Sequence, residues 1–340
     1  MDTLSELLGF AGKAFVIFIT VAATTAVFFA IARRRRLGSG ARLDVKPLHQ
    51  RFEALGDALR NGVLDRNSLK SLRKERKQQG KDQQAKPSVK PNVYVLDFDG
   101  DILASSVISL RDEVSAIVAV AKPEDEVVVR LESPGGGVPH YGLAAAQLVR
   151  LKERKVKVTV CVDRVAASGG YMMACVADRI VAAPFSIVGS IGVVAQVPNF
   201  HRLLKKYDVD YQEMTAGEFK RTVSVFGEIT EKGKEKFTEQ LEETHTLFKD
   251  FVKSQRPSLD VAKVATGEYW LGTRAKELGL VDQLGTSDDY LMSRATAANV
   301  YQVKFTPEGS WRRRFGAIGG DMLERAVMLV LTRLRSLQLS

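Results

Sequence analysis

The chain has 340 residues, 45% of them hydrophobic, and a formal net charge of +10, so it is long enough for one large domain or two modest ones with a sizeable core. Its two cysteines, Cys161 and Cys175, form no CxxC pair and are too few for a disulfide framework or a closed zinc site. We expect both to be small buried residues.

An uncharged segment, residues 14–32, lies near the N-terminus. As a helix it would span about 28 Å, close to the thickness of a bilayer core. Arg33 to Arg36 follow at once, whereas a cleaved signal peptide carries its charges before the apolar run. We therefore predict an uncleaved single-pass anchor over residues 1–36. The positive-inside rule, taken alone, places the C-terminal body in the cytoplasm.

The excess positive charge belongs to the segment that follows the anchor. Residues 33–90 hold 17 of the 50 Lys and Arg residues but only 6 of the 40 Asp and Glu residues. We interpret residues 37–90 as a basic juxtamembrane tether that contacts membrane lipids, with residues 69–86 either a solvated helix or disordered. We expect no nucleic-acid binding, because the stretch has no interleaved aromatics and no nucleic-acid fold signature.

From Pro91 onward, short apolar runs alternate with helical patterns. This alternation predicts an α/β fold with a mainly parallel sheet. The expected strands are 92–102, 126–133, 155–163 and 179–184, and the expected helices are 114–122, 141–154, 168–178 and 230–256. A second amphipathic helix at 321–339 packs on a partner subunit or lies at the membrane surface.

The first motif with chemical content is a glycine loop, SPGGGV at 133–138, directly after an expected strand. Three glycines cost chain entropy, and a bare backbone approaches a ligand closely with its N–H groups exposed. No Lys-Ser or Lys-Thr follows, which disfavours a phosphate-binding P-loop. An oxyanion hole and a plain tight turn stay open as interpretations.

The second motif places Ser168 between a strand and a helix, in the run AASGG. The helix N-terminus favours developing negative charge there, so Ser168 is a candidate nucleophile. An N-capping serine is the alternative. The third motif, AGEFKR at 216–221, offers Lys220 as a base, since a lysine can act as one when burial lowers its pKa. Few histidines compete, and none has a recognisable triad context.

In their order, SPGGGV, the stretch 163–193 with ASGGY and GSIGV, and AGEFKR resemble the S49 family of signal peptide peptidases. The resemblance covers about residues 91–300. It implies a ClpP- and crotonase-like fold of stacked ββα units at 91–305, which we expect together with the N-terminal transmembrane helix and a helical C-terminal extension at 306–340.

The resemblance also implies site residues and a function. Ser168 and Lys220 would form a Ser–Lys dyad, and Ser190 would orient the lysine amine. The N–H groups of Gly136 and Gly169 would be the oxyanion donors, with Gly135 shaping the loop. The expected activity is that of a membrane-anchored serine endopeptidase needing no metal or cofactor. It would act on peptide or unfolded protein substrates, such as signal-peptide remnants or misfolded envelope proteins.

Three points stay open at this stage. The family is described as facing the periplasm of the bacterial inner membrane, against the positive-inside rule. The expected homo-oligomeric ring or bowl leaves undecided whether the dyad forms within one chain or between chains. The competing functions are a non-enzymatic membrane scaffold of the same fold and a crotonase-like acyl-CoA enzyme.

Overall fold

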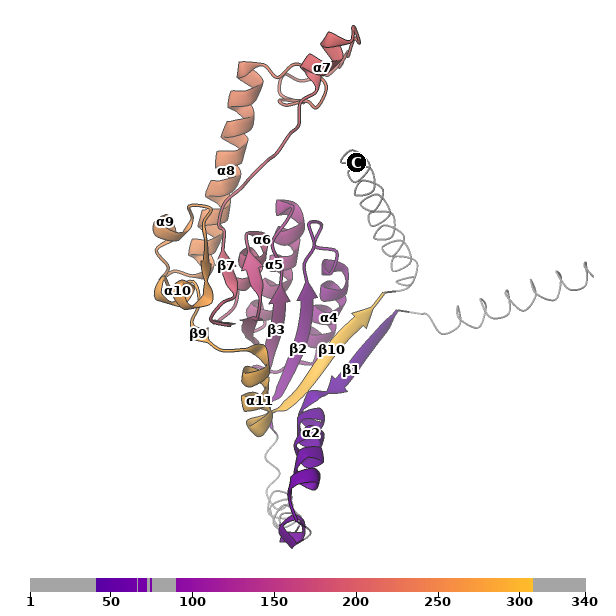
Figure 1. Cartoon of the computed structure of the whole chain (residues 1–340), viewed down its shortest axis with the longest axis vertical. Helices are drawn as coiled ribbons and strands as arrows, with labels where there is room; N and C mark the ends of the chain where they lie inside the picture. Colours follow the sequence, from indigo (N-terminus) through magenta and orange to yellow (C-terminus); the bar gives the residue numbers. More distant parts are fainter. Residues whose placement is uncertain (1–40, 66, 72–73, 75–89, 308–340) are drawn as a thin grey trace, which may run out of the picture. The chain divides into compact units, whose positions relative to one another are not determined.

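The computed structural model describes residues 41–65, 67–71, 74 and 90–307 (Figure 1). Apart from the first residues of strand β1 and the last of strand β10, the elements below belong to one compact unit, Asp44–Lys304. The predicted anchor at 14–32 and the predicted helix at 321–339 lie outside the described residues. Within the described ranges, no helix combines the length and the apolar character that crossing a bilayer requires.

A seven-stranded sheet forms the centre of this unit, in the order β1-β10-β2-β3-β4-β6-β9. Pairing is parallel from β10 through β9. The mainly parallel α/β sheet predicted from the alternating pattern is therefore confirmed. The strands are β1 (Arg42–Pro47), β2 (Asn92–Asp99), β3 (Glu126–Glu132), β4 (Lys157–Val162), β6 (Arg179–Ala182), β9 (Gln283–Leu284) and β10 (Asn299–Thr306).

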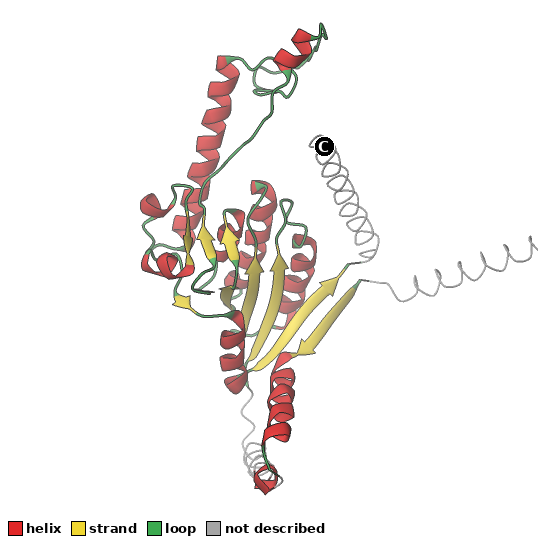
Figure 2. Ribbon diagram, in the orientation of Figure 1, coloured by secondary structure: helices red, strands yellow, loops and turns green. Residues whose placement is uncertain are grey.

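Helices cover both faces of this sheet, because alternate side chains of its central strands enter two separate cores (Figure 2). In β3, Val127, Val129 and Leu131 join the larger core, whereas Val128 joins the smaller. The larger core lies under α4 (Val107–Val120), α5 (Val138–Glu153) and α6 (Gly169–Ala174). The smaller core includes residues of α2 (Leu48–Val63) and α11 (Ser287–Ala297).

A second, three-stranded sheet consists of β5 (Val165–Ala167), β7 (Ile187–Gly189) and β8 (Tyr269–Leu271). Strands β5 and β7 are parallel, and β8 runs antiparallel to β7. A single parallel bridge between Ser133 and Ala166 joins the end of β3 to this small sheet. Three-residue strands are too short to show a sequence period, so none of them was predicted.

The longest described helix, α8 (Glu231–Gln255), carries a projecting segment. In Figure 1, α7 (His201–Lys206) and the loop that follows it lie at the end of α8 farthest from the sheet. We call residues 193–230 the arm. At its other end, α8 is tied to the body because the Arg256 guanidinium binds both Asp282 carboxylate oxygens, at 2.6 and 2.9 Å. Two short helices, α9 (Val261–Val264) and α10 (Gly272–Glu277), follow.

Part of the segment interpreted as a tether is folded onto the sheet. Strand β1 occupies the sheet edge and α2 begins with the buried Leu48. His49 accepts a hydrogen bond from the Val300 N–H at 3.2 Å through Nδ1. The net charge of residues 37–90 predicted a tether, whereas the contacts that fold this part onto the sheet are made by a few residues such as Leu48 and His49. Cys161 and Cys175 are both buried free thiols, as expected.

Candidate active site

The predicted nucleophile lies where strand ends of the small sheet meet. Ser168 directly follows β5 and Ser190 directly follows β7, while the antiparallel β8 brings the residues before it to the same edge. The Ser168 N–H donates to the Gly189 carbonyl at 2.8 Å, and the Ser190 N–H donates to the Glu268 carbonyl at 2.7 Å. Two serines 22 positions apart in the chain are thereby fixed side by side.

These residues open onto a cleft of about 730 Å³. Ser168 and Ser190 both line it, and both are half-buried. Its remaining walls are the glycine loop with Val138, the segment 192–194, His245 from α8, and Thr266 with Gly267. A cleft of this size with a partly exposed hydroxyl at its wall has the dimensions of a small-molecule or peptide site.

Ser168 has a backbone conformation that L-residues rarely adopt, with φ 52° and ψ −118°. Such strain persists where the surrounding structure fixes it, and it is concentrated at functional sites. Ser168 is also the N-cap residue of α6, but its side chain makes no capping hydrogen bond. The N-cap alternative therefore leaves the hydroxyl unexplained, whereas a nucleophile needs it free.

The glycine loop presses directly against this serine. Gly135 has φ 93°, and a Cβ atom on it would lie 2.9 Å from the Gly169 nitrogen. The N–H of Gly135 is engaged by Ser133 Oγ at 3.1 Å, and that of Gly137 by the Ile102 carbonyl at 2.9 Å. Among the described residues, the N–H groups of Gly136 and Gly169 have no hydrogen-bond partner. Two unengaged donors beside a strained serine are what an oxyanion hole requires.

Two buried hydroxyls lie beneath the loop. Ser133 Oγ and the Tyr141 hydroxyl are 2.5 Å apart, and the Tyr141 hydroxyl donates to the Asp101 carbonyl at 2.8 Å. Burial raises the pKa of Tyr141 above its usual value, which keeps this donor protonated. Sequence reasoning gave Ser133 no role of its own within the SPGGGV motif, and it missed Tyr141, which belongs to no motif.

His245 is another residue that sequence reasoning left aside. Its Nε2 lies 3.2 Å from the Ile191 carbonyl, which places an α8 side chain in the wall of the cleft. A signal was available, because His245 shares a helical face with Leu241, Phe248 and Val252, spaced at i−4, i+3 and i+7. The described residues contain no group of three or more His, Cys, Asp or Glu side chains placed to hold a metal ion.

Lys220 lies elsewhere, on the arm. Its side chain is exposed, and it is not among the residues that line the cleft with Ser168. Both neighbours of Lys220 are fixed. Phe219 lies beneath two α8 ammonium groups, those of Lys232 and Lys236, each 5.6 Å from its ring centroid. On the other side Arg221 pairs with the Glu213 carboxylate at 2.9 Å.

Within one chain, the structure therefore brings together Ser168, Ser190, Gly135, Gly136 and Gly169, the five predicted residues other than the lysine. Lys220 is held on a separate, ordered support at the far end of α8. The arrangement places a strained serine and two unengaged N–H groups in one cleft, and an exposed lysine on the arm of the same chain.

Comparisons with known proteins identify the family of this chain. The profile of Peptidase family S49 matches residues 150–301, and that of Peptidase family S49 N-terminal matches residues 2–148. A putative protease SohB of Buchnera aphidicola subsp. Baizongia pistaciae is 43% identical over 305 residues, covering 86% of each chain. The chain therefore belongs to peptidase family S49.

Two further similarities complete the comparison. A probable protease SohB of Haemophilus influenzae is 62% identical over 224 residues, which cover 66% of this chain and 64% of that protein. Among solved structures, the 1510-N membrane-bound stomatin-specific protease in complex with a substrate peptide aligns over 63% of this chain and 93% of its own, at 13% identity and a TM-score of 0.41.

Proposed function

We propose that this chain is a serine endopeptidase with Ser168 as nucleophile and Lys220 as general base. The observation that carries the proposal is the strained Ser168 in a cleft beside the unengaged N–H groups of Gly136 and Gly169. Membership of peptidase family S49 and the similarity to proteases named SohB support the same reaction class.

In the proposed reaction, the neutral Lys220 amine removes the proton from the Ser168 hydroxyl, and the oxygen attacks a peptide carbonyl. The Gly136 and Gly169 N–H groups stabilise the tetrahedral oxyanion. The lysine ammonium then protonates the leaving amine, and water hydrolyses the acyl-enzyme. Ser190 would orient the incoming lysine amine, a role supported by its position in the lining of the same cleft as Ser168.

We further propose that the dyad forms between two copies in a homo-oligomeric ring or bowl. The support is geometric: Lys220 is exposed on the arm rather than in the cleft of its own chain. The arm also exposes large apolar side chains that a partner copy would cover, among them Tyr207 at 69% and Met214 at 90% exposure. Its neighbouring aromatic rings, Phe200, Phe226 and Tyr211, are packed together at 5.8 and 6.2 Å.

The remaining parts of the proposal rest on sequence. Residues 14–32 would anchor the chain in the bacterial inner membrane, and the basic segment behind them would contact lipid headgroups. Signal-peptide remnants and misfolded envelope proteins are the substrates we propose. Digestion of spheroplasts with an added protease tests the side of the membrane, because only a periplasmic body is degraded without lysis.

A fluorophosphonate probe tests the nucleophile. It should label the purified wild-type protein and not the Ser168→Ala variant. Absence of labelling in the wild type, with a folded protein confirmed by circular dichroism, would leave the non-enzymatic scaffold as the better reading. A test for coenzyme A binding separates the crotonase-like alternative.

Mixing two inactive variants tests the dyad between copies. After joint refolding, equal amounts of Ser168→Ala and Lys220→Ala should regain about one quarter of the wild-type peptidase activity, since random assembly pairs an intact serine with an intact lysine at that frequency. An inactive mixture, with the oligomer present by light scattering, would place both residues in one chain.

A further inference from the structure

The two oxyanion donors lie on separate segments, the glycine loop and the start of α6, so something must fix their spacing. We propose that Ser133 and Tyr141 are positioning residues that hold the Gly136 and Gly169 N–H groups in place for the oxyanion. This inference rests on the proposed function, and it assigns a role to the buried hydroxyl pair, which takes no direct part in the reaction described above.

Ser133 connects both segments through its own atoms. It is fully buried, and its Oγ accepts from the Gly135 N–H at 3.1 Å, next to the donor of Gly136. Its backbone N–H donates to the Val165 carbonyl at 2.9 Å, and its carbonyl accepts from the Ala167 N–H at 3.0 Å. One residue thus links the glycine loop to β5, the strand that ends just before Ser168.

Tyr141 completes the link from the other side. Its hydroxyl donates to the Asp101 carbonyl, so the proton in the 2.5 Å contact with Ser133 comes from the serine. That direction leaves a lone pair of Ser133 Oγ for the Gly135 N–H. The Tyr141 ring also supports the start of α6, because a Cβ atom on Gly169 would lie 2.4 Å from its Cγ.

The Ser133 and Tyr141 hydroxyls are closely packed on all sides that the glycine positions probe. A Cβ atom on Gly100 would lie 2.3 Å from Ser133 Oγ and 2.4 Å from the Tyr141 hydroxyl, so the backbone of residue 100 closes over both oxygens. The pair is therefore packed tightly between that backbone and the two donor segments. A change in either hydroxyl has to be taken up by the loop or by α6, where the donors are.

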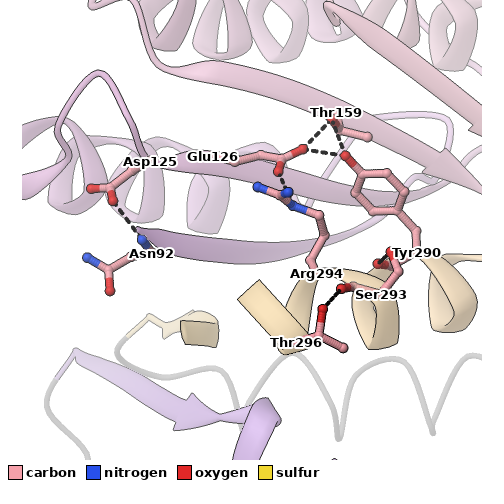
Figure 3. Close-up of polar contacts among 8 residues, drawn as sticks. All are labelled: Asn92, Asp125, Glu126, Thr159, Tyr290, Ser293, Arg294 and Thr296. Atoms are coloured by element: carbon pink, nitrogen blue, oxygen red, sulfur yellow. Dashed lines mark hydrogen bonds and ion pairs between the residues drawn. The ribbon is translucent and has the colours of Figure 1, made fainter. Parts of the chain in front are cut away.

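A matched control lies at the opposite end of strand β3. Strand β3 begins at Glu126 and is followed at its other end by Ser133. The Tyr290 hydroxyl donates to Glu126 Oε1 at 2.6 Å, next to Thr159 and Arg294 (Figure 3). Tyr290 is also a mostly buried phenol, but it contacts no part of the cleft. Tyr290→Phe also removes a phenol hydroxyl, but one that has no contact with the Gly136 and Gly169 N–H groups.

The experiment compares Tyr141→Phe and Tyr290→Phe with the wild type in peptide hydrolysis. We expect Tyr141→Phe to lower kcat about ten-fold with KM unchanged, less than the 10²–10³-fold typical of losing a donor outright. Affinity for a peptide aldehyde, which forms an oxyanion with Ser168, should fall by the same factor. Tyr290→Phe should lower the melting temperature and leave kcat and aldehyde affinity unchanged. Ser133→Ala, which removes the other hydroxyl without adding volume to this tightly packed position, should also lower kcat with KM unchanged.

Equal kcat values for the two phenylalanine variants, in a wild type that is active, would overturn this inference and leave the proposed function standing. A loss that appears only in KM would also overturn it. Absence of both hydrolysis and fluorophosphonate labelling in the wild type would overturn the proposed function first, and this inference with it.

Discussion

Gly135 and Ser168 are packed so closely that a Cβ atom on Gly135 would lie 2.7 Å from the Cβ of Ser168. That separation is shorter than any two side-chain carbons tolerate, and it comes with φ 93° at Gly135. The residue therefore has two independent reasons to be glycine. Both concern the alignment of the loop with the proposed nucleophile rather than the stability of the core.

The first prediction follows from this contact. Gly135→Ala should lower kcat by about 10²-fold or more, because the loop must move and take the Gly136 donor with it. Steady-state hydrolysis of a fluorogenic peptide measures the effect. Gly142→Ala is the matched control, since it lies within α5 with nothing within 4 Å of its Cβ position. That variant should keep full activity and gain up to about 1 kcal/mol in unfolding free energy.

The second prediction separates the two candidate bases. His245 lines the same cleft as Ser168, but its Nε2 is occupied by the Ile191 carbonyl. We expect His245→Ala to keep measurable hydrolysis and fluorophosphonate labelling, whereas Lys220→Ala loses both by at least about 10²-fold. The reverse pattern would make His245 the base and remove the need for a second copy.

The third prediction concerns the support of Lys220. Glu213 pairs with Arg221 and accepts hydrogen bonds from the Tyr211 and Ser224 hydroxyls, at 3.1 and 3.2 Å. Glu213→Arg should therefore disorder the residues around Lys220 and lower kcat about ten-fold or more. Adding Arg221→Glu restores opposite charges and should recover part of the loss. The exposed Arg274–Glu277 pair, exchanged in the same way, is expected to change nothing. No recovery in the double exchange would refute the role of this ion pair.

The fourth prediction is a loss of stability in alkali. Burial raises the pKa of Cys161, and likewise that of Cys175, from 9.0 to about 12. Between these values the unfolded chain releases thiol protons that the folded chain retains, so stability is full below pH 9 and falls as pH rises above it. The slope is at most about 2.7 kcal/mol per pH unit for two thiols.

Urea unfolding at pH 7 to 10.5 measures this slope. Replacing both cysteines with alanine should flatten the fall between pH 9 and 10, before the tyrosines whose pKa burial raises contribute, among them Tyr141 and Tyr290. A thiol-reactive dye should modify neither residue in the folded protein at pH 8. Rapid modification of either thiol, or an unchanged slope in the double variant, would contradict the prediction.

Sequence pattern predicted the central strands well because their apolar runs are long and rich in β-branched residues. The range predicted for β3, 126–133, differs from the observed Glu126–Glu132 by one residue. The helix predicted at 168–178 ends earlier, at Ala174, because the N–H groups of Val176 and Ala177 bond three residues back rather than four. The strands of the small sheet were out of reach, since each has only three residues and depends on partners far along the chain.

The residues of the candidate site likewise fall into those that the sequence could predict and those that it could not. The glycine loop was predictable because it follows the recognisable strand β3, and Ser168 because it lies between the recognisable strand β4 and a helical pattern. The neighbourhood of Ser190 and the inward position of His245 were not, since they follow from pairing among β5, β7 and β8 and from the docking of α8. Position along the chain also gave no indication that Lys220 would be held so far from the cleft of its own chain.

Helix α8 contacts three separate parts of the molecule. Arg256, just past its last residue, fastens it to the sheet, His245 contributes to the cleft, and Lys232 and Lys236 grip the residue before Lys220. In an α-helix each added residue advances the tip by about 1.5 Å and swings it by about 100°. The number of residues from Lys232 to Arg256 therefore sets the position of Lys220 relative to Ser168. A single inserted residue in α8 would turn the Lys220 amine in a new direction, although every motif of the site would be unchanged.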